Sequence, residues 1–152
     1  MEKLCFIILL ITLLSACNLQ DGDTEISESA PSLNIEVSES PEELERITGV
    51  VCWDNCSNED LGFGFSNIDK DKMPTNIIKE DALFLITHEG TEADRYGYFA
   101  ITDKGVGYNT FIEDNTFTPY KQETKYLVIA QWLDNSRQLK GYTYAMFEVE
   151  TQ

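Results

Sequence analysis

Short hydrophobic stretches, separated by polar or glycine-containing segments, follow one another from Ile47 to the end of the chain. One of them alternates strictly, with Leu61, Phe63 and Phe65 spaced by glycines. This period of two is typical of a β-strand, and no stretch has the length and period of a long helix. The pattern predicts strands at Ile47–Trp53, Leu61–Phe65, Ala82–Thr87, Tyr96–Thr102, Val106–Ile112, Tyr126–Leu133 and Tyr142–Val149. Seven such strands predict an all-β domain: a single antiparallel β-sandwich, or alternatively a small barrel.

The last two stretches can be sorted by sheet face, because side chains alternate across a strand. Glu148 and Glu150 indicate that one face of the final stretch meets solvent, and Gln131 indicates the same for its neighbour. An exposed apolar patch on these faces would be typical of a protein-binding surface. The alternative is that another part of the chain covers it. The residues of this candidate binding face are Tyr142, Tyr144, Met146, Leu127, Ile129 and Leu133.

The net charge of the chain limits the kinds of partner that it is expected to bind. The 152 residues carry 27 acidic and 11 basic side chains, a formal charge of −16. Nucleic acid binding needs a basic surface that displaces counterions, so no nucleic acid partner is expected. Binding to an anionic membrane surface also requires basic side chains on the protein. Contact with a membrane would therefore have to come from a lipid attached to the protein.

The N-terminus has the pattern of a secretion signal. Lys3 precedes an apolar run from Leu4 to Leu14, which is followed by the small residues Ser15 and Ala16. Eleven residues rise only about 16 Å as a helix, too little to cross a bilayer of about 30 Å. A short apolar run of this kind predicts a signal peptide over residues 1–16.

The four residues Leu14-Ser15-Ala16-Cys17 resemble the lipobox of bacterial lipoprotein precursors. The resemblance implies cleavage before Cys17 and attachment of lipid to its thiol, so that acyl chains such as palmitate hold the protein on a membrane. Asn18 follows the cysteine where lipoproteins of the inner membrane often carry Asp. By resemblance, the expected location is the cell envelope: the outer membrane where the host has one, otherwise the outer face of the plasma membrane. An ordinary signal peptide with a chance cysteine is the alternative.

The segment that follows is acidic and poor in residues to bury. From Asn18 to Glu45 there are nine acids, no base and no aromatic residue. Such a composition cannot offset the entropy of ordering, and like charges keep the chain extended. The expected organisation is a signal peptide at 1–16, Cys17 with a disordered tether at 17–45, and a β-sandwich at 46–152.

Cys52 and Cys56 have three residues between them, and outside the cytoplasm two such thiols are expected to form a structural disulfide. A redox pair is the alternative, but redox motifs have two intervening residues and open a helix. A metal site would have at most Cys52, Cys56 and His88 as ligands, so no metal is expected. The twelve residues from Asp69 to Glu80 have the length of a calcium loop but Pro74 where its glycine belongs, which indicates a solvated loop.

No catalytic residue is predicted. His88 is the only histidine, and no nucleophile elbow or glycine-rich phosphate loop accompanies it. No cofactor is expected. The final two stretches resemble the closing strands of bacterial immunoglobulin-like and fibronectin-like modules, which implies an immunoglobulin-like sandwich. An oligosaccharide-binding-type barrel is the alternative fold.

The leading functional hypothesis is a membrane-anchored, non-enzymatic envelope lipoprotein that binds another envelope or secreted protein. The first alternative is a secreted-side enzyme, either a thiol oxidoreductase using Cys52 and Cys56 or a carboxylate hydrolase. The second is a surface inhibitor or immunity-type protein, which differs from the leading hypothesis only in its partner.

Overall fold

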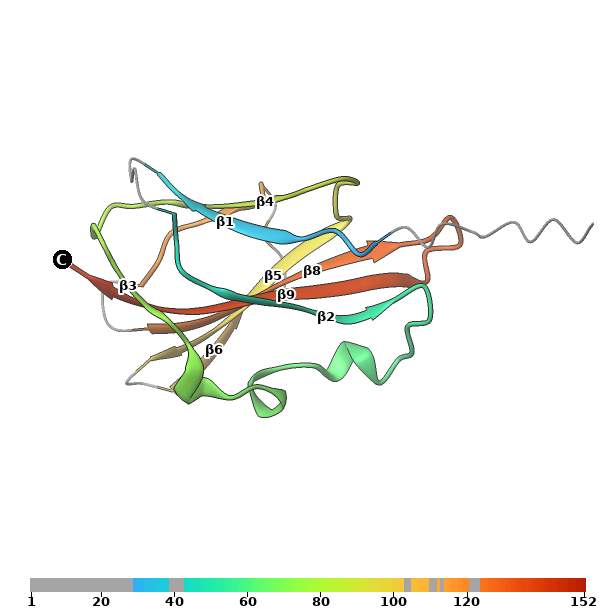
Figure 1. The fold of residues 1–152 in the computed structure, drawn as a ribbon, viewed down its shortest axis with the longest axis horizontal. Helices are drawn as coiled ribbons and strands as arrows, with labels where there is room; N and C mark the ends of the chain where they lie inside the picture. Colours follow the sequence, from blue (N-terminus) through green and yellow to red (C-terminus); the bar gives the residue numbers. More distant parts are fainter. Residues whose placement is uncertain (1–28, 39–42, 103–104, 110–111, 113, 121–123) are drawn as a thin grey trace, which may run out of the picture.

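Two β-sheets packed face to face make up the molecule in a computed structural model that describes residues 29–38, 43–102, 105–109, 112, 114–120 and 124–152 (Figure 1). The predicted sandwich is confirmed, and the described strands do not close into a barrel. The predicted signal peptide and Cys17 lie outside the described residues.

The described residues contain nine strands and three single-turn 3₁₀ helices. Six of the seven predicted strands are confirmed, with shifted ends. Three further strands were not predicted, and two of them, at 75–78 and 116–117, are too short to give a pattern in the sequence. The elements are β1 (Leu33–Val37), β2 (Ile47–Trp53), η1 (Asp60–Gly62), η2 (Phe65–Asn67), η3 (Lys70–Lys72), β3 (Thr75–Ile78), β4 (Phe84–His88), β5 (Arg95–Thr102), β6 (Gly105–Asn109), β7 (Thr116–Phe117), β8 (Thr124–Leu133) and β9 (Leu139–Thr151).

The larger sheet has the order β2-β9-β8-β5-β6, all antiparallel. Strand β9 is long enough, at 13 residues, to pair with two strands in succession. Its first part pairs with β2, and its end pairs with β3, the one parallel contact in this sheet among the described strands. A register shift between Trp132 and Leu133 places Trp132 opposite Gly141 and Leu133 opposite Leu139.

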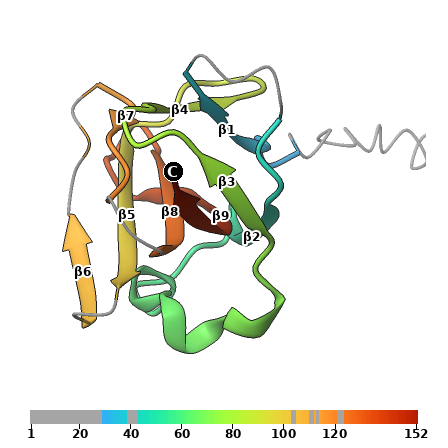
Figure 2. The same cartoon turned by 90° about the vertical axis from the view of Figure 1, so that its left-hand side faces the viewer.

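The smaller sheet has the order β1-β4-β7 and covers one face of the larger sheet (Figure 2). Strand β1 lies inside the segment that was predicted to be a disordered tether, so that prediction is wrong from Leu33 to Val37. Leu33 and Ile35 are fully buried, and Leu44 is buried as well. The alternating apolar residues of this segment pair with β4. The stabilisation from this pairing and burial outweighs the repulsion among the acidic residues around them. The folded domain therefore begins near Leu33 instead of at residue 46.

The main core lies between the two sheets and is rich in aromatic rings. Phe84 of β4 packs edge-on against Tyr126 and Phe147, with ring centres 5.7 and 5.4 Å apart. The face of β8 and β9 opposite to the candidate binding face points into this core, as strand alternation predicts. Its residues are all buried: Tyr126, Val128, Ala130, Trp132, Thr143, Ala145, Phe147 and Val149. Burial raises the pKa of the Tyr126 hydroxyl well above its usual value, although that oxygen accepts the backbone N–H of Tyr120 at 2.7 Å.

The opposite face of the larger sheet is covered by residues 54–74, which run beneath it from β2 to β3 (Figure 2). The strand predicted at Leu61–Phe65 is wrong, since this segment forms η1 and η2. Its backbone is satisfied locally: the N–H of Phe63 donates to Asp60 and that of Asn67 to Gly64. The phenyl rings at 63 and 65 face the sheet, and the predicted solvated loop at 69–80 contributes buried Met73 and strand β3.

Candidate functional site

The candidate binding face of the β8–β9 hairpin is not exposed. Tyr142 is 1% exposed and Leu127 0%, and Ile129 and Met146 are also buried. Phe65 and Met73 of the covering segment pack on them and form a second core with half-buried neighbours such as Phe63. The proposal of an exposed apolar face is therefore wrong, and the alternative that the chain covers itself is correct.

The remaining two residues of that face, Tyr144 and Leu133, are half-buried. Tyr144 lies with its ring centre 4.8 Å from that of Phe63. It also crosses Gly49 of β2, where an added Cβ would come within 2.6 Å of the tyrosine ring. A glycine at position 49 is thus required for this ring to lie flat on the sheet.

Glu148 did not mark a solvated face as expected, since it is only 8% exposed. Lys125 Nζ lies 3.2 Å from its carboxylate, and the Thr75 hydroxyl donates to it at 3.2 Å. The ion pair is satisfied by its neighbours, as a buried charge must be. This network joins β3, β8 and β9 through their side chains.

The Cys52–Cys56 disulfide is present, as predicted. It lies where β2 passes into the covering segment, and the intervening Asp54 has a left-handed backbone with φ of 61°. The N–H of Asp54 donates to the carbonyl of Lys140 at 2.7 Å, and Cys56 Sγ lies 3.3 Å from the same oxygen. The bridge therefore fixes the start of the covering segment against β9.

A hollow of about 470 Å³ opens beside this disulfide at the turn that joins β8 to β9. We call it the hairpin hollow. Two of the chain's three arginines line it, together with amide side chains and leucines, and no acid does so. Its lining residues are Cys56, Ser57, Asn58, Leu61, Arg95, Gln131, Leu133, Arg137, Gln138 and Leu139.

The walls of the hairpin hollow are held by carboxylates that bond to backbone. Asp134 accepts the N–H groups of Ser136 and Gln138 at 2.7 and 2.9 Å, which orders the β8–β9 turn. Asp94 accepts the N–H of Leu133 at 2.8 Å. Asp60 accepts hydrogen bonds from the N–H and from the hydroxyl of Ser57. These bonds lower the pKa of Asp60, and the bond from the N–H has the larger effect. The acids near the hollow thus shape its loops without lining it.

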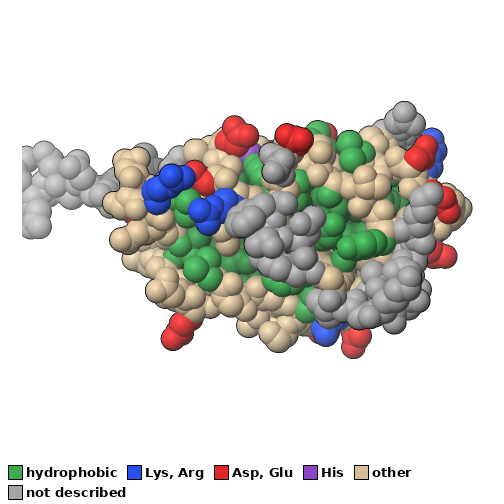
Figure 3. Space-filling model, turned by 180° about the vertical axis from the view of Figure 1, so that it is seen from behind, with side chains coloured by type: hydrophobic (Ala, Val, Ile, Leu, Met, Phe, Trp, Pro, Cys, Tyr) green, Lys and Arg blue, Asp and Glu red, His purple; other side chains and the backbone are tan. Residues whose placement is uncertain are grey.

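Seen from behind, basic side chains gather at the end of the molecule that carries the β8–β9 turn, with hydrophobic side chains beside them (Figure 3). Arg137 is placed here by a left-handed backbone with φ of 64°. The sequence alone does not predict this site, because its residues come from three separate segments. The sequence feature that could have indicated the site is the small number of arginines, because Arg95 and Arg137 each lie next to a predicted strand or turn.

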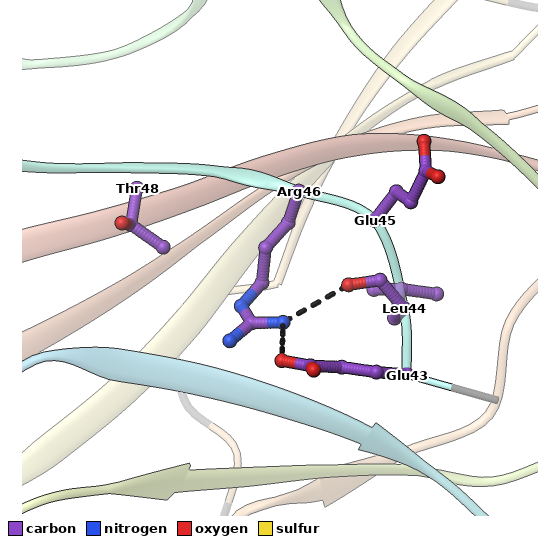
Figure 4. A pocket seen from close by; sticks show the side chains of 5 residues that line it. All are labelled: Glu43, Leu44, Glu45, Arg46 and Thr48. Atoms are coloured by element: carbon purple, nitrogen blue, oxygen red, sulfur yellow. Dashed lines mark hydrogen bonds and ion pairs between the residues drawn. The ribbon is translucent and has the colours of Figure 1, made fainter. Parts of the chain in front are cut away.

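A second hollow, of about 350 Å³, is lined by Glu43, Leu44, Glu45, Arg46 and Thr48 (Figure 4). Its arginine is already engaged: Arg46 Nη1 lies 3.1 Å from a carboxylate oxygen of Glu43 and donates to the carbonyl of Leu44 at 2.9 Å. A third hollow, of about 300 Å³, shares Glu43 and Glu45. Both hollows therefore differ from the hairpin hollow in being lined by acids.

His88 is a packing residue in this structure. Its Nδ1 lies 3.0 Å from the hydroxyl of Tyr96, and its ring packs edge-on to Trp132. Burial raises the pKa of the Tyr96 hydroxyl above its usual value. Within the described part of the chain, no three His, Cys, Asp or Glu side chains are grouped as metal ligands, and Cys52 and Cys56 are joined to each other.

Comparison of this chain with known protein families, with curated proteins and with solved structures finds no match. None of the helices among the described residues is long and apolar enough to span a membrane.

Proposed function

We propose that this chain is a lipid-anchored protein of the bacterial envelope that binds another envelope or secreted protein and does not catalyse a reaction. The observation that carries the proposal is the lipobox-like sequence Leu14-Ser15-Ala16-Cys17, which is followed closely by a disulfide-bonded β-sandwich. Each buried methylene of an acyl chain contributes about 0.8 kcal/mol, so two or three chains on Cys17 hold a protein firmly on a membrane.

The corrected start of the domain supports a close association with the membrane. Fifteen residues, 18–32, separate Cys17 from β1, where the sequence alone indicated a tether of 28 residues. Fifteen residues reach at most about 50 Å when extended and span about 20 Å as a random coil. The domain would thus lie about 20 Å, and at most about 50 Å, from the membrane surface.

The proposed anchor would lie nearest to one particular end of the domain. Strand β1 begins at the end of the sandwich that carries the β8–β9 turn (Figure 1). The hairpin hollow opens at this same turn. A partner that meets this end would therefore be close to the membrane, which favours another envelope protein.

The anchor is tested with two matched cysteine substitutions. Cys17→Ser removes the thiol that would be lipidated, whereas Cys5→Ser changes a cysteine within the apolar run. We expect mass spectrometry of the mature N-terminus to find a lipidated Cys17 in the wild type and in Cys5→Ser, and the Cys17→Ser protein to leave the membrane fraction. An unmodified Cys17 in the wild type would refute the anchor.

The binding function is tested by crosslinking in living cells from positions around the hairpin hollow, such as Leu61, and from Lys79 as a distant control. We expect one specific envelope or secreted partner to be captured from Leu61 and not from Lys79. Its identity separates a structural partner from the target of a surface inhibitor or immunity-type protein. Equal background capture from both positions would contradict a binding function at this end.

A further inference from the structure

We propose that the hairpin hollow binds a carboxylate-bearing peptide segment of the partner, and that Arg137, assisted by Arg95, holds the carboxylate. This inference rests on the proposed binding function and assigns it a place and a chemistry. The three hollows differ in the charged residues that line them. Glu43 and Glu45 line the two others, whereas two arginines and no acid line the hairpin hollow.

Arg137 is the principal contact. Its side chain is exposed in the β8–β9 turn and has no ion-pair partner among the described residues. The backbone around it is ordered by the carboxylate of Asp134 and by the bond from its own N–H to the Asp134 carbonyl at 2.9 Å. A guanidinium on an ordered turn can form two parallel bonds with one carboxylate, which gives geometric selectivity.

The net charge of −16 does not prevent an acidic ligand from binding here. At physiological ionic strength, charges farther than about 8 Å away are largely screened. Contacts with the lining guanidinium groups therefore outweigh repulsion by acids spread over the rest of the surface. The acids that hold the walls of the hollow, Asp60, Asp94 and Asp134, each accept a hydrogen bond from a backbone N–H group.

The other lining residues favour a peptide over a free inorganic anion. The amides of Asn58, Gln131 and Gln138 each provide donors and an acceptor, the two groups that a peptide bond presents in complementary form. Leu61 is 49% exposed and supplies apolar surface beside the arginines. A peptide with an acidic side chain next to an apolar one would match this combination. A flat membrane surface would not fill a concave site.

The test uses the mature lipoprotein in detergent micelles, labelled with ¹⁵N and titrated with the peptide acetyl-Leu-Glu-Leu-amide. We expect amide shifts confined to residues 56–61, 95 and 131–139, and binding about tenfold weaker for the glutamine analogue acetyl-Leu-Gln-Leu-amide. Arg137→Gln should weaken binding of the glutamate peptide by about tenfold, and Arg95→Gln should weaken it by less. Lys79→Gln, which removes the same charge from the exposed loop before Ala82, should leave affinity unchanged.

Three results would overturn this proposal: no shifts in these residues up to about 10 mM peptide, equal binding of the two peptides, or an Arg137→Gln protein that binds like the wild type. Sodium acetate that binds as tightly as the peptide would show a site for free carboxylates. Saturation by phosphatidylglycerol vesicles with no peptide effect would show a lipid headgroup site. A failed peptide titration with intact lipidation of Cys17 refutes only this site, whereas loss of the anchor with intact peptide binding refutes only the proposed location.

Discussion

The two faces of the larger sheet are both buried, but in different ways. The inner face packs against a second sheet, and its core joins rings from β4, β8 and β9. The outer face packs against residues 54–74, a segment of turns and 3₁₀ helices that contributes Phe63, Phe65 and Met73. The inner core is thus built from hydrogen-bonded strands on both sides, and the outer core from strands on one side only.

Apolar residues on both faces of a strand therefore predict that both faces are buried, but they do not predict which kind of structure covers each face. A strand buried on both faces reads as a nearly continuous apolar run, and β8 has this character from Tyr126 to Ala130. The inner cover requires register and pairing. The outer cover requires only a chain of sufficient length with large side chains at suitable places, and it is fixed at its start by the Cys52–Cys56 bridge.

The largest effect is expected in the inner core. Phe147→Ala removes a ring that is 0% exposed and packs against Phe84 and Tyr126. Loss of a buried phenylalanine costs about 3–5 kcal/mol, because a cavity remains among rigid neighbours. Urea unfolding followed by fluorescence should show this loss in the free energy of unfolding. A cost below about 1 kcal/mol would contradict the assignment of this ring to the main core.

A smaller effect is expected from the bridge that begins the outer cover. Replacing Cys52 and Cys56 together by serine opens a loop of five residues. The loop-entropy relation assigns about 2 kcal/mol to a loop of this size. Urea unfolding of the double variant measures it, and wild-type protein in strong reductant is the control. A stable double variant, together with rapid reduction of the wild-type bridge by glutathione, would favour the thiol oxidoreductase alternative instead of a structural bridge.

The smallest effect is expected from the cover itself. Phe63 is half-buried, with its ring centre 4.8 Å from that of Tyr144 and 6.2 Å from that of Tyr142. Phe63→Ala should cost about 1 kcal/mol of stability, since part of the ring already meets solvent. Hydrogen exchange should then accelerate at residues 59–73 and stay unchanged in β8 and β9. A cost equal to that of Phe147→Ala would show that the two cores unfold as one unit.

Local sequence patterns were sufficient to predict the fold class and much of the inner core. Period-two alternation in 126–133 and 142–149 identified the inward faces, because the geometry of a strand imposes that period wherever the strand lies. Cysteine spacing, together with the predicted location outside the cytoplasm, was sufficient to predict the disulfide. The anchor at Cys17 remains a prediction from its local pattern. These are local properties, and a local pattern is sufficient to infer them.

Which residues lie on the surface depends on the tertiary structure and could not be predicted from local patterns. Leu33 and Ile35 look like tether in the sequence, and they are core because β4 pairs with them. Tyr142 and Met146 look exposed, and they are buried because the chain folds back over them. The hairpin hollow unites Leu61, Arg95 and Arg137 from three distant segments. Burial and proximity depend on contacts between segments far apart in the chain, and no local period carries that information.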